Sequence, residues 1–375
     1  MYQLYGCIIK LRHPPVSTHY RFVINETLSY PAVTICRNPS YKTSVLQDFN
    51  LAKKNSNILF TSEWANFPFK NATLQDLWDK ATYSQSEVLQ LYGLHGHPEN
   101  VEVRRFYYFL YGQCFTLIPR VGSTMPWPNS GWSILLQHDK GDHSGSGRRL
   151  GLATDSDVNG YHIFIHEVRE PWSENDVQTH YIMQYQYIEV GEELEIKINA
   201  EEYNGISTEK RPCLRDINYS RYKCIESHRW TNISKKVGCT APWMRGVGLP
   251  HCNNYDQLKD LITNYLKFDD KNEWGCSMSC NTTAYKLFVV KRIPIDMPLS
   301  HLYIYFSSKM VTKMEELPGY DFNAFLSDLG GSLGFFLGLS VIGTIGIIEK
   351  FLRIIFCYAK PSLAETKKPT DVVDK

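Results

Sequence analysis

The sequence predicts an α+β membrane protein in which a disulfide-rich extracellular domain is followed by a C-terminal transmembrane helix. Three observations predict this fold class: eight cysteines are dispersed between the chain ends, five N-glycosylation sequons lie among them, and one long run near the C-terminus carries no charge. The overall composition is neutral, because 40 Lys and Arg against 39 Asp and Glu leave a net charge of +1. No global field therefore points to nucleic acid, and we expect no nucleic-acid partner.

The ten cysteines indicate the compartment. Cys7 and Cys357 lie near the ends, and six of the other eight fall between Cys213 and Cys280. Zinc sites use paired and closely spaced ligands, whereas a dispersed, even set is typical of disulfides in an oxidising compartment. The sequons agree with this location and predict glycosylation at Asn25, Asn71, Asn218, Asn232 and Asn281. We assign residues 13–320 to the extracellular domain.

Hydrophobic patterning predicts the elements of this domain. Strands are expected over residues 22–35 (around a turn and a proline), 161–166, 179–199, 284–293 and 301–306. Helices are expected over residues 44–52, 74–90 and 255–268. The remainder of residues 40–165 is expected to be irregular, with a Gly/Ser/Asp-rich loop over residues 140–159.

One segment has the length of a membrane span. Twenty residues from Leu329 to Ile348 carry no charge, and at about 1.5 Å per residue they cover about 30 Å, the thickness of a bilayer core. Six glycines in the run disfavour a buried helix in water but are tolerated in lipid. Basic residues follow the run, at Lys350, Arg353, Lys360, Lys367 and Lys368. The positive-inside rule therefore places residues 357–375 in the cytoplasm, after a membrane helix over residues 324–356.

Residues 1–12 are apolar but too short for a signal peptide or a span. We interpret them as the outer end of a first transmembrane helix whose beginning is missing, with a merely hydrophobic tail as the alternative.

The sequence contains only weak motifs for catalysis or metal binding. His138, Asp139, Asp142 and His143 have metal-ligand side chains, but they flank a Gly-rich polar turn that favours a solvated loop. No GxSxG, HExxH or Cys–His nucleophile context is present. We therefore expect no enzymatic activity, no metal and no cofactor.

Three blocks of the chain resemble the epithelial sodium channel/degenerin superfamily. YPAVTIC at Tyr30–Cys36 resembles the signature that follows the family's first membrane helix, and LSDLGGSLGFFLGLS at Leu326–Ser340 resembles its pore-helix signature. The cysteine-rich stretch over residues 213–280 resembles its thumb. The resemblance implies a mixed β-sheet palm with a helical thumb and finger, and the variable ectodomain is most similar to the insect pickpocket branch.

The resemblance also implies disulfide pairing. The family thumb pairs ten cysteines as a nested ladder, and here His228, Val237 and Trp274 stand at its third, fourth and eighth positions, while the seventh has no counterpart. In that ladder the third cysteine pairs with the eighth and the fourth with the seventh, so both partners of these two disulfides are absent together. The three complete rungs are Cys213–Cys280, Cys224–Cys276 and Cys239–Cys252, and Cys36–Cys114 is left as the fourth pair.

For the pore, the resemblance implies a trimer whose selectivity filter is Gly338-Leu339-Ser340 and whose gate, the degenerin position, is Ala324. It implies a stimulus-gated, amiloride-sensitive channel for sodium ions in the plasma membrane, formed by identical or related subunits. The glycines spaced every four residues are equally typical of a helix-packing seam. Gly346 stands where the family usually has an acidic residue, and Glu349 is either a substitute inner cation ring or an interfacial residue beside Lys350.

The chain departs from the family at its start, where the cytoplasmic His-Gly motif and a first membrane helix are expected in a multi-pass channel. An incomplete gene model is one explanation, and a short regulatory or dominant-negative isoform is another. The competing function is a non-conducting single-span surface protein with a ligand-binding ectodomain.

Overall fold

A computed structural model describes residues 2–51, 61–138, 159–173, 183–267, 275–337 and 341–358. The filter residues Gly338, Leu339 and Ser340 lie outside these ranges, as do Asp139, Asp142, His143 and Trp274 and the tail from residue 359. The chain divides into a main unit, residues 18–316, and a terminal unit, residues 1–17 together with 317–375.

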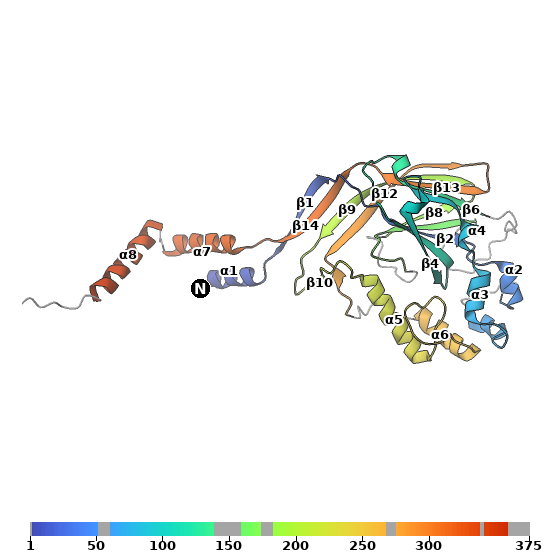
Figure 1. Ribbon diagram of the computed structural model, residues 1–375. Coiled ribbons are helices and arrows are strands. Elements are labelled where there is room, and N and C mark those ends of the chain that lie inside the picture. Colours follow the sequence, from blue (N-terminus) through green and yellow to red (C-terminus); the bar gives the residue numbers. More distant parts are fainter. Residues whose placement is uncertain are drawn as a thin grey trace, which may run out of the picture. The chain divides into compact units, whose positions relative to one another are not determined.

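The larger sheet of the main unit has seven strands, and its first and last strands along the chain are neighbours (Figure 1). The spatial order is β1 (Val16–Ile24), β14 (Met310–Pro318), β9 (Glu192–Asn204), β13 (Leu299–Phe306), β6 (Trp132–Gln137) and β3 (Leu89–Leu94), and β12 (Asn281–Pro294) also pairs with β9. Along β9, buried Leu194, Ile196 and Ile198 alternate with less buried polar residues, so this strand presents one face to the core.

The smaller sheet has five strands. Their order is β4 (Val101–Tyr108), β5 (Gly112–Pro119), β2 (Ala32–Asn38), β7 (Gly160–His166) and β8 (Gln184–Glu189). The strand β2 contains AVTIC and lies between β5 and β7, antiparallel to both. Its residues from Ala32 to Arg37 are all buried, which is why this stretch lacks the alternating pattern of a half-exposed strand.

One hydrophobic core lies between the two sheets. The smaller sheet contributes Ile35, Phe115 and Ile163, and the larger sheet contributes Ile196 and Ile304, all within 1% of complete burial. The α+β class and the disulfide-rich character of the domain are therefore confirmed, with a mixed sheet system at its centre.

The first helices differ from the prediction. We expected one helix over residues 74–90, but the structure has α3 (Leu74–Ala81) and α4 (Gln85–Val88) before strand β3. Two capping boxes explain the division, because Thr73 with Asp76 and Ser84 with Glu87 each begin a new helix. The earlier helix α2 (Thr43–Asp48) and the 3-10 turns η1 (Thr61–Asn66), η2 (Pro98–Asn100) and η3 (Pro128–Ser130) complete this part.

The expectation that residues 40–165 are otherwise irregular is wrong, since strands β3 to β6 lie there. Their cross-strand partners are far away in the sequence, so short apolar runs such as β6 gave no clear local signal. The strand expected over residues 22–35 is likewise divided into β1 and β2 by residues 25–31. The strand expected over residues 179–199 is also two strands, β8 and β9, separated by Gly191 at a φ of 77°.

The thumb consists of helices α5 (Arg221–Val237) and α6 (Tyr255–Lys267) and the short parallel strands β10 (Cys213–Leu214) and β11 (Met278–Ser279). Helix α5 begins at the N-cap Ser220, whose hydroxyl accepts a hydrogen bond from the Lys223 amide, and ends at Gly238 in the left-handed region. Trp230 of α5 stacks on Tyr265 of α6 at 5.7 Å between ring centroids.

A second, aromatic core joins the thumb to the first helices. The ring centroid of Trp243, in the loop between α5 and α6, lies 4.7 Å from that of Trp78 in α3 and 4.8 Å from that of Phe109. All three rings are buried. The thumb is therefore held by aromatic packing from a segment more than 100 residues earlier as well as by its own disulfides.

The terminal unit contains α1 (Tyr2–Arg12), α7 (Phe322–Leu337) and α8 (Val341–Tyr358), and α1 contacts α7. Lys10 of α1 lies above the ring of Tyr320, 5.7 Å from its centroid.

Candidate functional site

The structure describes helical residues on both sides of the predicted filter, in α7 and α8, and residues 338–340 between them lie outside the described residues. A single membrane helix over residues 324–356 therefore stays a prediction. Among the residues that the structure describes, no helix has both the length and the apolar character needed to cross a bilayer. The physical reason is that α7 has only 16 residues, while α8 carries Glu349, Lys350 and Arg353 within its 18 residues.

The predicted gate residue Ala324 lies in the first turn of α7. Its amide donates to the Asp321 carboxylate at 2.8 Å, so Asp321 caps the helix and fixes the position at which it begins. Tyr320, just before the cap, donates its hydroxyl to Asp328 two turns into the helix at 3.0 Å. Ala324 is therefore held in a well-defined first turn and is half-buried.

The two C-terminal helices expose glycine and large apolar side chains within this single chain. A Cβ atom added at Gly330, Gly331 or Gly346 would meet no other atom within 4 Å. The large exposed apolar side chains described in them are Phe322, Leu326, Phe335, Ile345, Ile347, Ile348, Phe351, Leu352, Ile354 and Ile355. Exposed apolar side chains in this number are typical of surfaces that lipid or other protein surfaces cover.

Glu349, a predicted inner cation ring, forms an ion pair with Arg353 one turn further along α8. The distance from Arg353 Nη2 to Glu349 Oε1 is 2.7 Å. Both side chains are mostly exposed, at 77% for Arg353 and 60% for Glu349. The charge of this carboxylate is thus partly neutralised by Arg353 on the same helix. This ion pair affects both roles considered for Glu349, an inner cation ring and an interfacial residue.

The four expected cysteine pairs are disulfide-bonded in the structure. They are Cys36–Cys114, Cys213–Cys280, Cys224–Cys276 and Cys239–Cys252. The first joins the central strand β2 to β5, and the other three lie in the thumb. Cys7 is a free, buried cysteine in α1, and the side chain of Cys357 is outside the described residues.

His228 lies beside one of these disulfides. Its ring nitrogen and the sulfur atoms of Cys224 and Cys276 fall within 4.8 Å of one another. The two sulfur atoms are bonded to each other, so neither is the thiolate that a metal ion requires. This group is a disulfide with a neighbouring histidine, as the His228 position in the family ladder implies.

Four of the five sequon asparagines, at positions 71, 218, 232 and 281, are exposed. Asn25 is half-buried, and its side-chain amide donates to Glu202 at 3.5 Å. Glycosylation at these positions stays a prediction.

A buried charged group that the sequence analysis missed joins the smaller sheet to the thumb. The Glu170 carboxylate accepts hydrogen bonds from the Ser220 hydroxyl and from the amides of Arg221 (3.2 Å) and Tyr222 (3.3 Å), so it caps helix α5 from outside. Nearby, Glu167 accepts from the Thr283 amide of β12 at 3.2 Å. The only sequence signal is two acidic residues three positions apart directly after a buried strand, which is too common to identify the contact.

Burial is the main cause of the pKa shifts in and beside strand β7. Burial raises the pKa of Glu167, and the ion pair with Arg169 only partly opposes that shift. Burial lowers the pKa of His166, whose Nε2 lies 2.8 Å from the Thr34 hydroxyl. Further along the same strand, burial lowers the pKa of His162 to about 4. All three groups therefore favour their neutral forms more than they would in water.

Comparisons with known proteins identify the class. The family model described as the amiloride-sensitive sodium channel matches residues 1–349. The human protein acid-sensing ion channel 4 is 21% identical over 374 residues, covering 91% of this chain and 69% of that protein. A solved structure of a proton-activated chloride channel aligns with a TM-score of 0.34 and 8% identity over 95% of this chain and 90% of that chain, a likeness too low to support any argument.

The protein is therefore of the ion-channel class and is not an enzyme. The chain belongs to the amiloride-sensitive sodium channel family, which confirms the resemblance to the epithelial sodium channel/degenerin superfamily.

Proposed function

We propose that this protein is a subunit of a stimulus-gated, amiloride-sensitive and sodium-selective channel of the plasma membrane. The observation that best supports the proposal is the family match over residues 1–349, which includes the filter, the gate and the whole disulfide-linked domain. The conducting assembly is a trimer of identical or related subunits, and the protein is a pickpocket-like member of the family. The C-terminal tail is cytoplasmic, and the main unit is extracellular and glycosylated.

In this assembly the C-terminal helices are covered by lipid and by the equivalent helices of two other subunits. The open space around Gly330 and Gly331 supports this arrangement, because a neighbouring helix can approach a glycine backbone closely. Three copies of Gly338-Leu339-Ser340 surround the axis and replace part of the hydration shell of sodium with carbonyl and hydroxyl oxygens. Non-helical backbone at this depth is acceptable where it lines a water-filled path.

Gating is proposed to act at Ala324. A side chain larger than alanine in the first turn of α7 is expected to prevent the closed packing of three helices around the axis. Asp321 is a positioning residue in this scheme, since its carboxylate fixes the turn that carries Ala324.

The test is electrophysiology of oocytes that express the full chain, alone and with a conducting member of the family. We expect Ala324→Val to produce a constitutive sodium current that amiloride blocks in at least one of these two settings. Asn323→Val is the matched control, because Asn323 is an exposed neighbour in the same turn and is not expected to change the current.

Surface biotinylation separates expression from conduction. If Ala324→Val reaches the surface and neither carries nor alters a sodium current in either setting, the channel proposal is wrong. A non-conducting surface protein with a ligand-binding ectodomain would then be the better description.

A further inference from the structure

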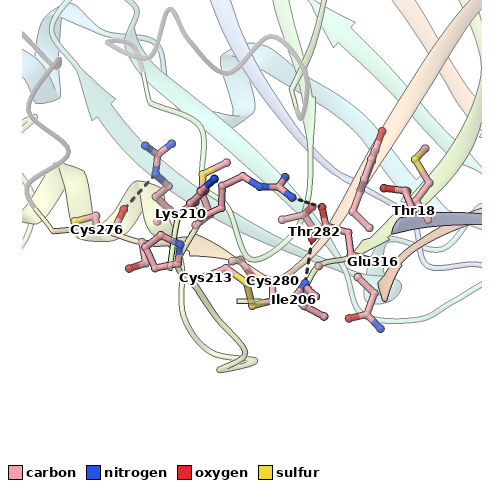
Figure 2. Close-up of a pocket in the computed structure, with 18 of the residues that line it drawn as sticks. Thr18, Ile206, Lys210, Cys213, Cys276, Cys280, Thr282 and Glu316 are labelled. Atoms are coloured by element: carbon pink, nitrogen blue, oxygen red, sulfur yellow. Dashed lines mark hydrogen bonds and ion pairs between the residues drawn. A yellow bond between two sulfur atoms is a disulfide. The ribbon is translucent and has the colours of Figure 1, made fainter. Parts of the chain in front are cut away.

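The main unit contains a cavity of about 650 Å³ at the base of the thumb (Figure 2). Its wall is built from β1 and β14, from the end of β9 with the linker that follows it, and from the chain that returns from the thumb through β11 to β12. The volume is in the range of cavities that bind small organic molecules. The disulfide Cys213–Cys280 lies in the wall and ties the outgoing chain to the returning chain.

The charged residues of the wall are mainly basic. Lys210, Arg211 and Arg221 line the cavity, and Glu316 is the one carboxylate among its lining residues. Arg211 pairs with Glu316 at 2.9 Å, and the second oxygen of Glu316 accepts from the Ile206 amide at 3.1 Å. Both oxygens of this carboxylate are thus engaged, and the lining residues include three basic groups and one acidic group.

Arg221 is oriented by the thumb. Its Nε donates to the carbonyl oxygen of Cys276 at 3.3 Å, as the dashed line in Figure 2 shows. Cys276 is itself fixed by the disulfide to Cys224. A guanidinium held in this way loses little conformational freedom when an anion binds, which favours recognition of a carboxylate.

The rest of the wall offers an apolar surface. Tyr20, Tyr203, Met278 and Met314 line the cavity, and Tyr20 is 66% exposed and Met278 51% exposed. Exposed aromatic and thioether side chains next to basic groups fit a ligand that has both an anionic head and a hydrocarbon body. A bare inorganic anion would make no use of these side chains, and a metal cation would meet a net positive wall.

We propose that this cavity binds a small amphipathic carboxylate, such as a medium-chain fatty acid. The carboxylate is held by Arg221 and Lys210, and the alkyl chain lies against Tyr20 and Met278. This site is separate from the conduction segment, and its occupancy does not depend on whether the protein conducts.

Binding is measured with the full chain in lipid nanodiscs by equilibrium dialysis of radiolabelled octanoate, with empty nanodiscs subtracted. We expect saturable binding of one octanoate per chain. Unlabelled octanoate should displace the label, whereas acetate, octan-1-ol and octylamine at the same concentration should not. Saturable binding that is displaced equally by octan-1-ol or octylamine would overturn the role of the carboxylate, and displacement by acetate would overturn the role of the alkyl chain.

Variants locate the site. Arg221→Gln should weaken octanoate binding roughly tenfold or more because it removes a charge-assisted contact, and Lys210→Glu should do so because it reverses the charge beside the carboxylate. Lys223→Gln is the matched control, since Lys223 is exposed on the same helix and does not line this cavity. Lys210 is exposed on the linker after β9, so its variant is expected to fold. Absence of saturable binding, or equal binding by Lys210→Glu and Lys223→Gln, would overturn the proposal.

Discussion

The helices of the thumb and the C-terminal helices solve the same packing problem in opposite ways. In α5 and α6, Ile233, Leu258 and Leu261 are at most 2% exposed and face a core shared with the rest of the main unit. In α8, Ile345, Ile348 and Phe351 are 53–65% exposed within the chain. The thumb helices are amphipathic and bury their apolar faces within the main unit, whereas the C-terminal helices keep large apolar side chains exposed within the chain.

The disulfides also distinguish the thumb from the C-terminal helices. Cys224–Cys276 and Cys239–Cys252 restrain the thumb, and no disulfide joins the described residues of the terminal unit. The difference indicates that the thumb is stabilised by its own covalent bonds, whereas the described C-terminal helices have no such covalent restraint.

The largest expected effect is the loss of a thumb disulfide. Cys224→Ser with Cys276→Ser opens a loop with a sequence separation of 52, and chain entropy predicts a loss of about 4 kcal/mol in the free energy of unfolding. Cys239→Ser with Cys252→Ser opens a separation of 13 and should cost about 3 kcal/mol. Urea unfolding of the full chain in nanodiscs, followed by tryptophan fluorescence, measures both. An equal or reversed order would contradict the loop-entropy explanation.

A core substitution tests the burial contrast directly. Leu261→Ala should lower the free energy of unfolding of the main unit by roughly 2–5 kcal/mol, because Leu261 is fully buried. Ile348→Ala in α8 should change it by less than about 0.5 kcal/mol, because this side chain is outside that core. Leu266→Ala, on an exposed face of α6, is the control within the thumb. Comparable losses for Leu261→Ala and Leu266→Ala would contradict the explanation by burial, since alanine is the better helix former at both positions.

Acid should lower the stability of the smaller sheet, which contains His162. The pKa of His162 is lowered from 6.5 to about 4 by burial, so the stability from its neutral form is present above pH 6.5 and is lost as the pH falls through about 4. The shift corresponds to about 3 kcal/mol over that interval. Unfolding midpoints of wild type and His162→Phe between pH 7 and pH 4 should differ in slope, with the variant flatter.

Glu167 has the opposite effect on the pH dependence of stability. Its pKa is raised by burial, so its contribution increases as the pH falls and opposes the loss at His162. Glu167→Gln should therefore steepen the loss of stability in acid. A flatter profile for this variant would mean that the carboxylate stays ionised in the folded protein.

The smallest expected effect on stability is at Glu349. The exposed pair with Arg353 contributes about 0.3–0.5 kcal/mol, so Glu349→Gln should leave unfolding almost unchanged. The same variant distinguishes the two roles of this residue in a conducting channel. A lower single-channel sodium conductance would support the inner ring, and an unchanged conductance would support an interfacial residue. Arg353→Gln is the matched control that breaks the pair and keeps the carboxylate.

The sequence predicted best where a pattern is local. The alternation of Leu194, Ile196 and Ile198 in β9 and the helical spacing of Leu258, Leu261 and Ile262 in α6 both correspond to elements of the structure. The disulfide partners came from the family ladder and not from spacing, and all four pairs are bonded in the structure. The helix expected over residues 74–90 is divided at the capping box of Ser84 with Glu87, a local signal that the prediction did not use.

What could not be predicted depends on contacts between distant segments. The strand β6 is stabilised by β3 and β13, which lie on either side of it in the sheet but about 40 residues before it and more than 160 after it in the chain. The Glu170 cap of α5 joins residues with a sequence separation of about 50, and the cavity at the base of the thumb is assembled from both ends of the main unit. No single window of the sequence contains either arrangement.

The pairing of β1 with β14 has a consequence for how such chains can be recombined. The chain enters and leaves the main unit through these two adjacent strands. The main unit is therefore inserted into the terminal unit at only two junctions, near residues 17 and 317. An exchange at these two points transfers the sheets, the thumb, all four disulfides and the basic cavity together as one cassette. The main unit can therefore be inherited separately from the terminal helices by shuffling a single contiguous block of sequence.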